Sequence, residues 1–165
     1  MKKVSQIFQK ARKERRKHLL EPEAKAVCIE YEIPVTKFRV AKNAEEAVRF
    51  AEEMGYPVVL KIVSPDIIHK FDVGGVVLNL KSSEEVKDSY KRMMMKVKQH
   101  KPDAKIVGVL VQEMIPATTE IIVGATKDSQ FGPALMFGLG GIFVEVLKDV
   151  SFRIAPITRS EAQEM

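Results

Sequence analysis

The 165-residue chain lacks several features that whole classes of protein require. Cys28 is its only cysteine, which excludes an internal disulfide and a cysteine metal cluster and suits the reducing cytoplasm. No apolar run approaches the ~20 residues of a membrane helix, so we expect no membrane association. The basic start has no long apolar core and no small-residue cleavage site, so we expect no signal peptide.

Familiar nucleotide-binding and metal-binding motifs are missing as well. The chain has neither a GxxxxGK[ST] loop nor a GxGxxG motif after an early strand. The glycine-rich segment Phe137–Glu145 comes late, and a glycine-rich hairpin would explain it equally well. His69 has no second histidine or cysteine at metal-ligand spacing, which argues against a zinc site.

The positive charge is confined to the start of the chain. Residues 1–18 carry eight Lys and Arg against one Glu, a net +7, and because the whole chain carries +5 the remainder carries −2. Such an arm could contact nucleic acid or an acidic surface. No aromatic residues alternate with the charges for base stacking, so we expect a solvated or docking helix and not a nucleic-acid site.

Hydrophobic periodicity and turn signals predict a mixed α+β (α/β-like) fold, with helices mainly in the first half and strands mainly in the second. We expect three regions: a basic helix over 1–20, a first lobe over 21–112 and a second over 113–165. The expected helices cover 1–20, 22–31, 44–54 and 82–100. The expected strands cover 37–41, 57–63, 76–80, 106–114, 120–125, 134–137, 142–146 and 152–155.

The segment VVLKIVSPDIIHKFDVGGV, residues 58–76, carries the most chemical information. It places Lys61 in an apolar strand, where an ammonium group is costly unless an anion meets it. Gly74 and Gly75 follow in a loop whose backbone N–H groups could bind the same anion. A phosphate site is one interpretation. An edge strand with a solvated lysine and an ordinary glycine turn is the other, and the residues alone leave both open.

Other polar residues could complete such a site. Asp72 could orient the imidazole of His69, while Lys61 or Lys70 neutralises a phosphoryl group. The alternative for His69 is an ordinary surface loop. Glu113 and Glu120 could accept hydrogen bonds from ribose hydroxyls, although solvated glutamates are the default.

A magnesium ion would need carboxylate ligands near a strand end. Glu145 and Asp149 flank such an end and could face the ion, and Glu145 is the candidate metal ligand. Asp149 could equally form a structural ion pair with Arg153.

Taken together and in order, these segments resemble one family. The run EAVRFAEEMGYPVVLKIVSPDIIHKFDVGGV, then GVLVQEMI, then TEIIVGATKDSQFGPALMFGLGGIFVEVLKDVSFRIAPIT resembles the ATP-grasp (beta) subunit of ADP-forming acetyl-CoA and acyl-CoA synthetases. The resemblance covers residues from about 20 to 165. It implies a two-lobed ATP-grasp fold and the formation of ATP from acyl-CoA, ADP and phosphate. ATP or ADP and Mg²⁺ are the implied cofactors.

The resemblance also implies roles for individual residues. Lys61 matches the strand lysine that holds nucleotide phosphates, and His69 matches a histidine that relays a phosphoryl group. The other implied nucleotide contacts are Lys25 as a second basic group, Gly74 and Gly75 over the phosphates, Gln112, Glu113, Met114 and Ile115 at an adenine-binding hinge, and Glu120 at the ribose.

A partner is implied too. The CoA site and the main phosphohistidine belong to an alpha subunit in this family, which suggests a two-alpha, two-beta complex. Phe71 departs from the family pattern, which has a small polar residue there. The late acidic and asparagine metal ligands of the family do not occur before Met165, so we expect an incomplete second lobe.

The departures keep a second function class open, a non-catalytic ATP-grasp-like module that docks a partner through its basic helix. The ATP-grasp part of another ligase, either succinyl-CoA ligase-like or fused to an acetyltransferase, is a further alternative. Nucleic-acid binding through the basic arm would show a strong salt dependence.

Overall fold

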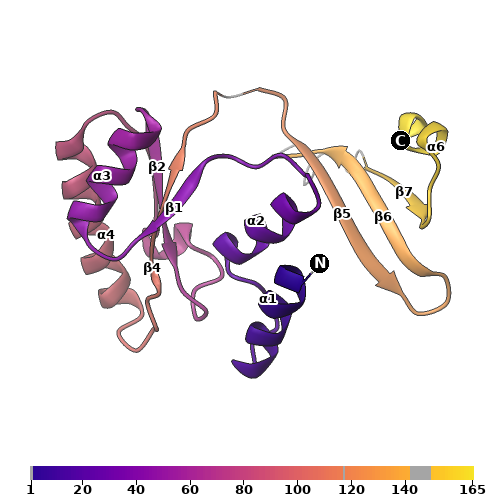
Figure 1. The fold of residues 1–165 in the computed structure, drawn as a ribbon, viewed down its shortest axis with the longest axis horizontal. Coiled ribbons are helices and arrows are strands. Elements are labelled where there is room, and N and C mark those ends of the chain that lie inside the picture. Colours follow the sequence, from indigo (N-terminus) through magenta and orange to yellow (C-terminus); the bar gives the residue numbers. More distant parts are fainter. Residues whose placement is uncertain (1, 117, 142–149) are drawn as a thin grey trace. The chain divides into compact units, whose positions relative to one another are not determined.

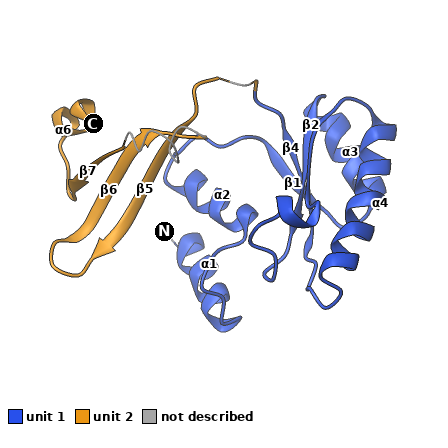
Figure 2. Cartoon of the chain, turned by 180° about the vertical axis from the view of Figure 1, so that it is seen from behind, with its two compact units in different colours: residues 1–115 blue, residues 116–165 orange. Residues whose placement is uncertain are grey.

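The computed structural model describes residues 2–116, 118–141 and 150–165 of the chain. It divides into two compact units, Met1–Ile115 and Pro116–Met165, shown in Figure 2. The first unit contains, in order, α1 (Lys2–Lys13), α2 (Glu21–Glu30), β1 (Phe38–Ala41), α3 (Ala44–Met54), β2 (Val58–Val63), the 3-10 turn η1 (Phe71–Val73), β3 (Val76–Leu80), α4 (Ser83–His100) and β4 (Gly108–Glu113). The second contains β5 (Ile121–Asp128), β6 (Gly132–Leu139), β7 (Val150–Ile154) and α6 (Arg159–Glu164).

Side-chain caps define where α3 and α4 begin. Asn43 Oδ1 accepts the Glu46 amide at 2.8 Å, and Ser82 Oγ accepts the Glu85 amide at 3.2 Å. Each cap satisfies one of the amides that a helix start leaves without a partner. α3 ends at Gly55, whose φ of +87° favours glycine. Both helix starts predicted from the sequence are confirmed.

The first unit is built on a four-stranded antiparallel sheet of order β1-β4-β2-β3. Strand β2 is therefore internal, and Lys61 lies between Leu110 of β4 and Val76 of β3. The interpretation of this segment as an edge strand is wrong. Residues of β2 also pack on both faces of the sheet, which explains its nearly continuous apolar run.

The two faces of this sheet have different cores. On one face Leu60 and Ile62 pack with Val86 and Met93. Figure 1 shows helices α3 and α4 covering this face of the sheet. The other face carries a smaller cluster, which includes Leu20 at the N-terminal cap of α2. Its buried members are Leu20, Val63 and Leu110, and its partly buried members are Phe38, Val40 and Val107. Each fully buried aliphatic side chain contributes roughly 1.5–3 kcal/mol, so the α3–α4 face supplies most of the stability.

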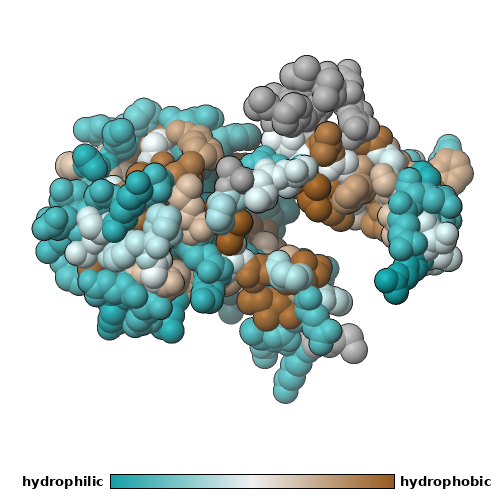
Figure 3. Space-filling view, turned by 90° about the horizontal axis from the view of Figure 1, so that it is seen from above, coloured by the Kyte–Doolittle hydropathy of each residue, from teal (hydrophilic) through white to brown (hydrophobic). Residues whose placement is uncertain are grey.

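The second unit is a three-stranded antiparallel sheet of order β5-β6-β7. Asp128 Oδ1 closes its first hairpin by accepting the Gln130 and Phe131 amides at 2.8 and 2.9 Å. Large apolar side chains remain exposed on its strands, as the brown surface over this unit in Figure 3 shows. They include Ile121, Val123, Phe152 and Ile154.

The structure corrects some expected boundaries. The first helix ends at Lys13 and not near residue 20, because Arg15 takes a positive φ of 55° and the chain turns there. The units divide after Ile115, whereas the sequence suggested 112. Helix α6 and turn η1 were not predicted, because their six and three residues give too little periodicity. The strand expected over 142–146 lies outside the described residues.

None of the described helices has the length and apolar character needed to cross a bilayer.

Candidate functional site

Lys61 faces a carboxylate of the same chain. Its Nζ donates to Glu21 Oε1 at 2.7 Å, and Lys70 Nζ lies 3.4 Å from Glu21 Oε2. The three side chains come from a strand, a loop and the first turn of α2, and each is only about a quarter exposed or less. The sequence argument considered a bound phosphate or solvent at Lys61, whereas in the structure the anion that meets Lys61 is the carboxylate of Glu21.

The charges around Glu21 alter its protonation. Burial alone would raise the pKa of Glu21, but the hydrogen bond from Lys61 and the charges of Lys61 and Lys70 outweigh burial and lower the pKa below its usual value. Glu21 is therefore ionised at neutral pH, and it compensates two ammonium groups in a half-buried environment.

Lys25 adds a third ammonium group, one helical turn after Glu21 on α2. Its Nζ donates to Thr36 Oγ1 and lies 5.3 Å from the centre of the Phe38 ring. Burial lowers the pKa of Lys25, the negative charge of Glu21 opposes this effect, and the positive charge of Lys61 reinforces it. The ammonium group of Lys25 would thus be stabilised by a further anion nearby.

A pocket of about 410 Å³ opens beside this cluster. Its lining residues are Glu21, Lys61, Ile68, His69, Lys70, Phe71, Asp72 and Val76. His69 therefore shares one cavity with two of the lysines. Within the described part of the chain, the side chains of His69 and Asp72 make no hydrogen bond, so the expected orientation of the imidazole by Asp72 is not seen in the structure. Phe71 lies 72% exposed at the cavity.

The backbone N–H groups of Gly74 and Gly75, which were expected to bind an anion, form hydrogen bonds within their own loop. The Gly74 amide donates to Phe71 O at 3.0 Å, and the Gly75 amide donates to Lys70 O at 2.7 Å. Both N–H groups are therefore used inside the loop and do not point to an external anion, which corrects that part of the sequence argument. Gly75 is required sterically, because a Cβ there would lie 2.5 Å from Ile62 Cγ2.

The expected hinge residues lie at the end of β4 and just after it. The Met114 amide donates to Pro57 O at 3.2 Å, and Glu113 Oε1 accepts the Lys37 amide at 2.6 Å. Gln112 Oε1 is buried and has no hydrogen-bond partner among the described residues. Gln112 shares its sheet face with Lys61, since Lys61 is paired with Leu110, two residues away. Ile115 is half exposed and ends the first unit.

The remaining candidates belong to the second unit. Glu120 O accepts the Gly140 amide at 2.8 Å, and a Cβ at Gly141 would lie 2.6 Å from Glu120 Oε2. Glu145 lies outside the described residues. In the three described ranges, no three His, Cys, Asp or Glu side chains gather as a metal site would require. The described residues thus form a pocket lined by two lysines, two carboxylates and His69, and they do not by themselves provide a magnesium site.

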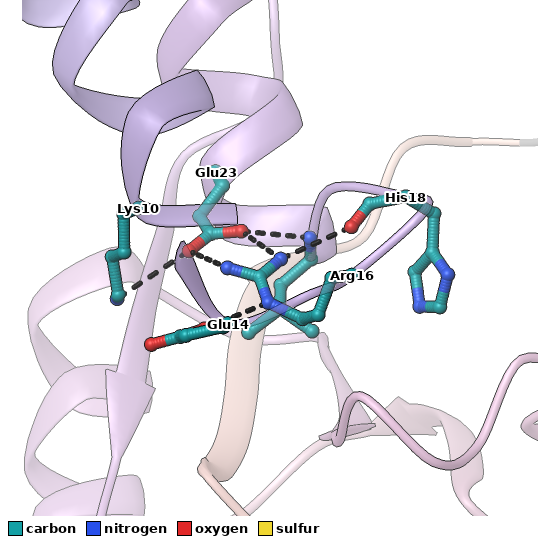
Figure 4. A network of polar contacts seen from close by, with 6 residues as sticks. Lys10, Glu14, Arg16, His18 and Glu23 are labelled. Carbon is teal, nitrogen blue, oxygen red and sulfur yellow. Dashed lines mark hydrogen bonds and ion pairs between the residues drawn. The ribbon is translucent and has the colours of Figure 1, made fainter. Parts of the chain in front are cut away.

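A polar network around Arg16 and Glu23 anchors the start of α2 (Figure 4). Arg16 donates to both carboxylate oxygens of Glu23, at 2.7 and 2.9 Å, and to the His18 carbonyl at 3.0 Å. Glu23 also accepts the Leu20 amide at 2.9 Å, and Lys10 lies 3.4 Å from it. This paired geometry fixes the start of the helix and hence the position of Glu21.

Sequence reasoning missed Glu21, Arg16 and Glu23. One usable signal was present: Glu21 and Glu23 flank Pro22, which is the pattern of an acidic first helical turn. The partners of both glutamates, however, are set by the tertiary structure.

Comparison with known proteins gives a consistent result. A family of ATP-grasp domains matches residues 10–165. The beta subunit of acetate–CoA ligase [ADP-forming] I from Pyrococcus furiosus is 56% identical over 163 residues, which make up 99% of this chain and 70% of that protein.

Two solved structures are similar to this chain in both fold and sequence. An acetyl-coenzyme A synthetase 1 of Ca. Korarchaeum cryptofilum, in complex with coenzyme A, Ca-AMPCP and HgCl⁺, has a TM-score of 0.93 and 53% identity, over 97% of this chain and 70% of that one. The same synthetase with coenzyme A and Mg-AMPPCP, its phosphohistidine segment pointing towards the nucleotide binding site, gives a TM-score of 0.84 and 48% identity. That match covers 98% of this chain and 68% of the other.

Proposed function

This chain belongs to the ATP-grasp domain family, and from that premise we propose that it is the nucleotide-binding part of an ADP-forming acyl-CoA synthetase. The reaction would move a phosphoryl group from a phosphohistidine to ADP, so that a P–N bond breaks and a P–O bond to the β-phosphate forms. The overall products would be ATP, CoA and the free acid, made from acyl-CoA, ADP and phosphate. The relatives' names as ADP-forming ligases support this reaction.

One observation supports the proposal most directly: Lys61, Lys70 and His69 line one cavity, and Lys25 lies nearby on α2. Phosphoryl transfer needs positioning and charge neutralisation more than covalent chemistry from the protein. Lys61 and Lys70 would hold phosphoryl oxygens. Their ammonium groups can do so from a half-buried site, where charges interact more strongly than in water.

Further contacts follow the family resemblance. His69 would accept and pass on the phosphoryl group, and Gly74 and Gly75 would shape the loop over it. At the nucleoside, the backbone from Gln112 to Ile115 would meet the adenine edge and Glu120 the ribose. Magnesium would assist when bound by balancing phosphate charge, with ligands beyond those identified among the described residues.

We also propose a partner. The P. furiosus relative is named a beta subunit, and an alpha subunit with the CoA site and the main phosphohistidine would complete a hetero-oligomer. Because ADP and CoA are cytoplasmic metabolites, we place the reaction in the cytoplasm.

The proposal is tested by titrating the unchanged chain and the Lys61→Ala variant with Mg-ADP in a calorimeter. Since Lys61 would hold phosphate oxygens, we expect at least about tenfold weaker binding, equal to ~1.4 kcal/mol. Lys87→Ala is the matched control, because Lys87 lies on the α4 surface 3.9 Å from Glu45 and away from the cavity. Equal ADP affinity in Lys61→Ala and the unchanged chain would refute the proposed role of the cavity.

A non-catalytic module is the second candidate, and the Lys61–Glu21 pair favours it, because an internal ion pair can be purely structural. It would dock a partner through α1, whose basic side chains are exposed. If neither the chain nor its complex with an alpha subunit bound ADP, this candidate would replace the first. A pull-down with residues 1–13 removed, which deletes α1 and keeps the Arg16 anchor of α2, would then test the docking helix.

A further inference from the structure

The Glu21 carboxylate contacts the two lysines that the proposed site would use to bind phosphate. Its two carboxylate oxygens engage two different ammonium groups, Oε1 with Lys61 at 2.7 Å and Oε2 with Lys70 at 3.4 Å. Lys61 extends from the internal strand β2, and Lys70 from the loop that leads to η1. A carboxylate with one oxygen on each lysine has the same contacts that two oxygens of a phosphoryl group would make.

The carboxylate is accessible from the cavity. Glu21 lines the 410 Å³ pocket together with both lysines and His69, and its side chain keeps 21% exposure. A ligand entering the pocket therefore meets Glu21 at the same time as the lysines. An anion cannot bind both ammonium groups fully while the carboxylate remains between them.

We propose that Glu21 is an exchangeable internal anion, which neutralises Lys61 and Lys70 in the empty site and is displaced by the phosphates of the ligand. This inference rests on the proposed function and extends it, because it names a specificity-determining residue of the same site. Without Glu21 the two lysines would face each other and Lys25 uncompensated.

Competition of this kind selects the ligand by charge. A carboxylate carries one negative charge, whereas a nucleoside diphosphate or pyrophosphate carries several and offers more acceptor oxygens. Anions with one charge gain little over the carboxylate that they displace. The observed affinity of any ligand is lowered by the fraction of molecules in which Glu21 holds the lysines.

The test compares Glu21→Gln with the unchanged 165-residue chain. Inorganic pyrophosphate and ADP are titrated separately by calorimetry. Glu30→Gln is the matched control, since Glu30 lies on the same helix and pairs with Lys3 at 3.0 Å, but does not line the cavity. We expect pyrophosphate to bind Glu21→Gln about tenfold more tightly than the unchanged chain, a difference of ~1.4 kcal/mol. The affinity of Glu30→Gln for pyrophosphate should equal that of the unchanged chain.

Thermal unfolding gives a second measurement. Without ligand, Glu21→Gln should unfold at a lower temperature than the unchanged chain, because the lysines lose their anion. Added pyrophosphate should raise its unfolding temperature by more than it raises that of the unchanged chain. If Glu21→Gln does not fold, Glu21→Asp, which withdraws the carboxylate by one methylene, should show the same changes at smaller size.

The outcomes separate the two proposals. Unchanged or weaker pyrophosphate binding in Glu21→Gln overturns the exchange, even where ADP still binds through Lys61. Tighter pyrophosphate binding, with no ADP binding in any variant alone or in complex with an alpha subunit, supports the exchange and refutes the proposed function. Absence of binding by both probes in every variant, alone and in that complex, overturns both.

Discussion

At the scale of single residues, the site depends on how one carboxylate and three lysines share charge. An unpaired Lys61 inside a sheet would be strongly destabilising, and Glu21 removes that penalty. The Lys61–Glu21 pair, at 2.7 Å in a half-buried environment, stabilises the fold more than an exposed surface ion pair does. The same carboxylate therefore stabilises the empty protein and would compete with phosphate.

The pH dependence of stability should reveal this pair. Because the pKa of Glu21 is lowered in the folded chain, its ion pair contributes fully above the ordinary carboxyl value of 4.5. The contribution is lost as the pH falls below that value through the folded-state pKa. Urea unfolding between about pH 3 and pH 6 should show a shallower loss of stability in Glu21→Gln than in Glu30→Gln. Parallel curves for the two variants would contradict this assignment.

At the scale of elements, α2 is held mainly by its first turn. It buries no side chain completely, so its packing is weaker than that of α3 or α4. Its position depends on the Arg16–Glu23 pair, whose side chains are only 6% and 13% exposed. The capping contact of Glu23 with the Leu20 amide adds to this anchor.

Glu23→Gln should therefore lower the free energy of unfolding substantially. Neutralising Glu23 breaks a buried, doubly hydrogen-bonded pair and leaves Arg16 only its more exposed partner Glu14, 2.7 Å from Nε. We expect a loss of about 3 kcal/mol in the free energy of unfolding. Glu30→Gln on the same helix breaks a more exposed pair with Lys3 and should lose less than about 1 kcal/mol. Chemical denaturation measures both variants, and similar losses would show that α2 does not depend on the Arg16–Glu23 anchor.

At the scale of the molecule, stability is unevenly divided. The buried apolar side chains of the described residues all lie between Val4 and Val111, within the first unit. The second unit presents large apolar side chains to solvent on a three-stranded sheet. Its strands pair through the backbone without a comparable core.

The first unit should consequently fold alone. We expect a fragment of residues 1–115 to unfold cooperatively, within about 5 °C of the main transition of the full chain, because its two cores remain intact. Differential scanning calorimetry of both proteins makes the comparison. Loss of the cooperative transition in the fragment would show that the second unit is needed to hold the first together.

Much of the fold follows from local sequence. Asn43 and Ser82 define helix starts through their own hydroxyl or amide oxygens, and the apolar run over 58–63 defines a strand. Within α4, Met93 is 1% exposed whereas Met95 is 57% exposed, because consecutive residues of a helix cannot all face the core. The family and the ATP-grasp fold, predicted from the ordered motifs, are confirmed by the matches to relatives and structures.

The chain's sequence by itself determined element types, helix caps, family and the presence of a lysine that required an anion, because these depend on neighbouring residues or on motif order. Tertiary structure alone decided which anion met Lys61. Glu21 is 40 residues away, and only the packing of α2 on the sheet brings the two together. It also decided that β2 is internal and that the Gly74 and Gly75 amides close their own loop, since strand order and hydrogen-bond partners arise from long-range packing.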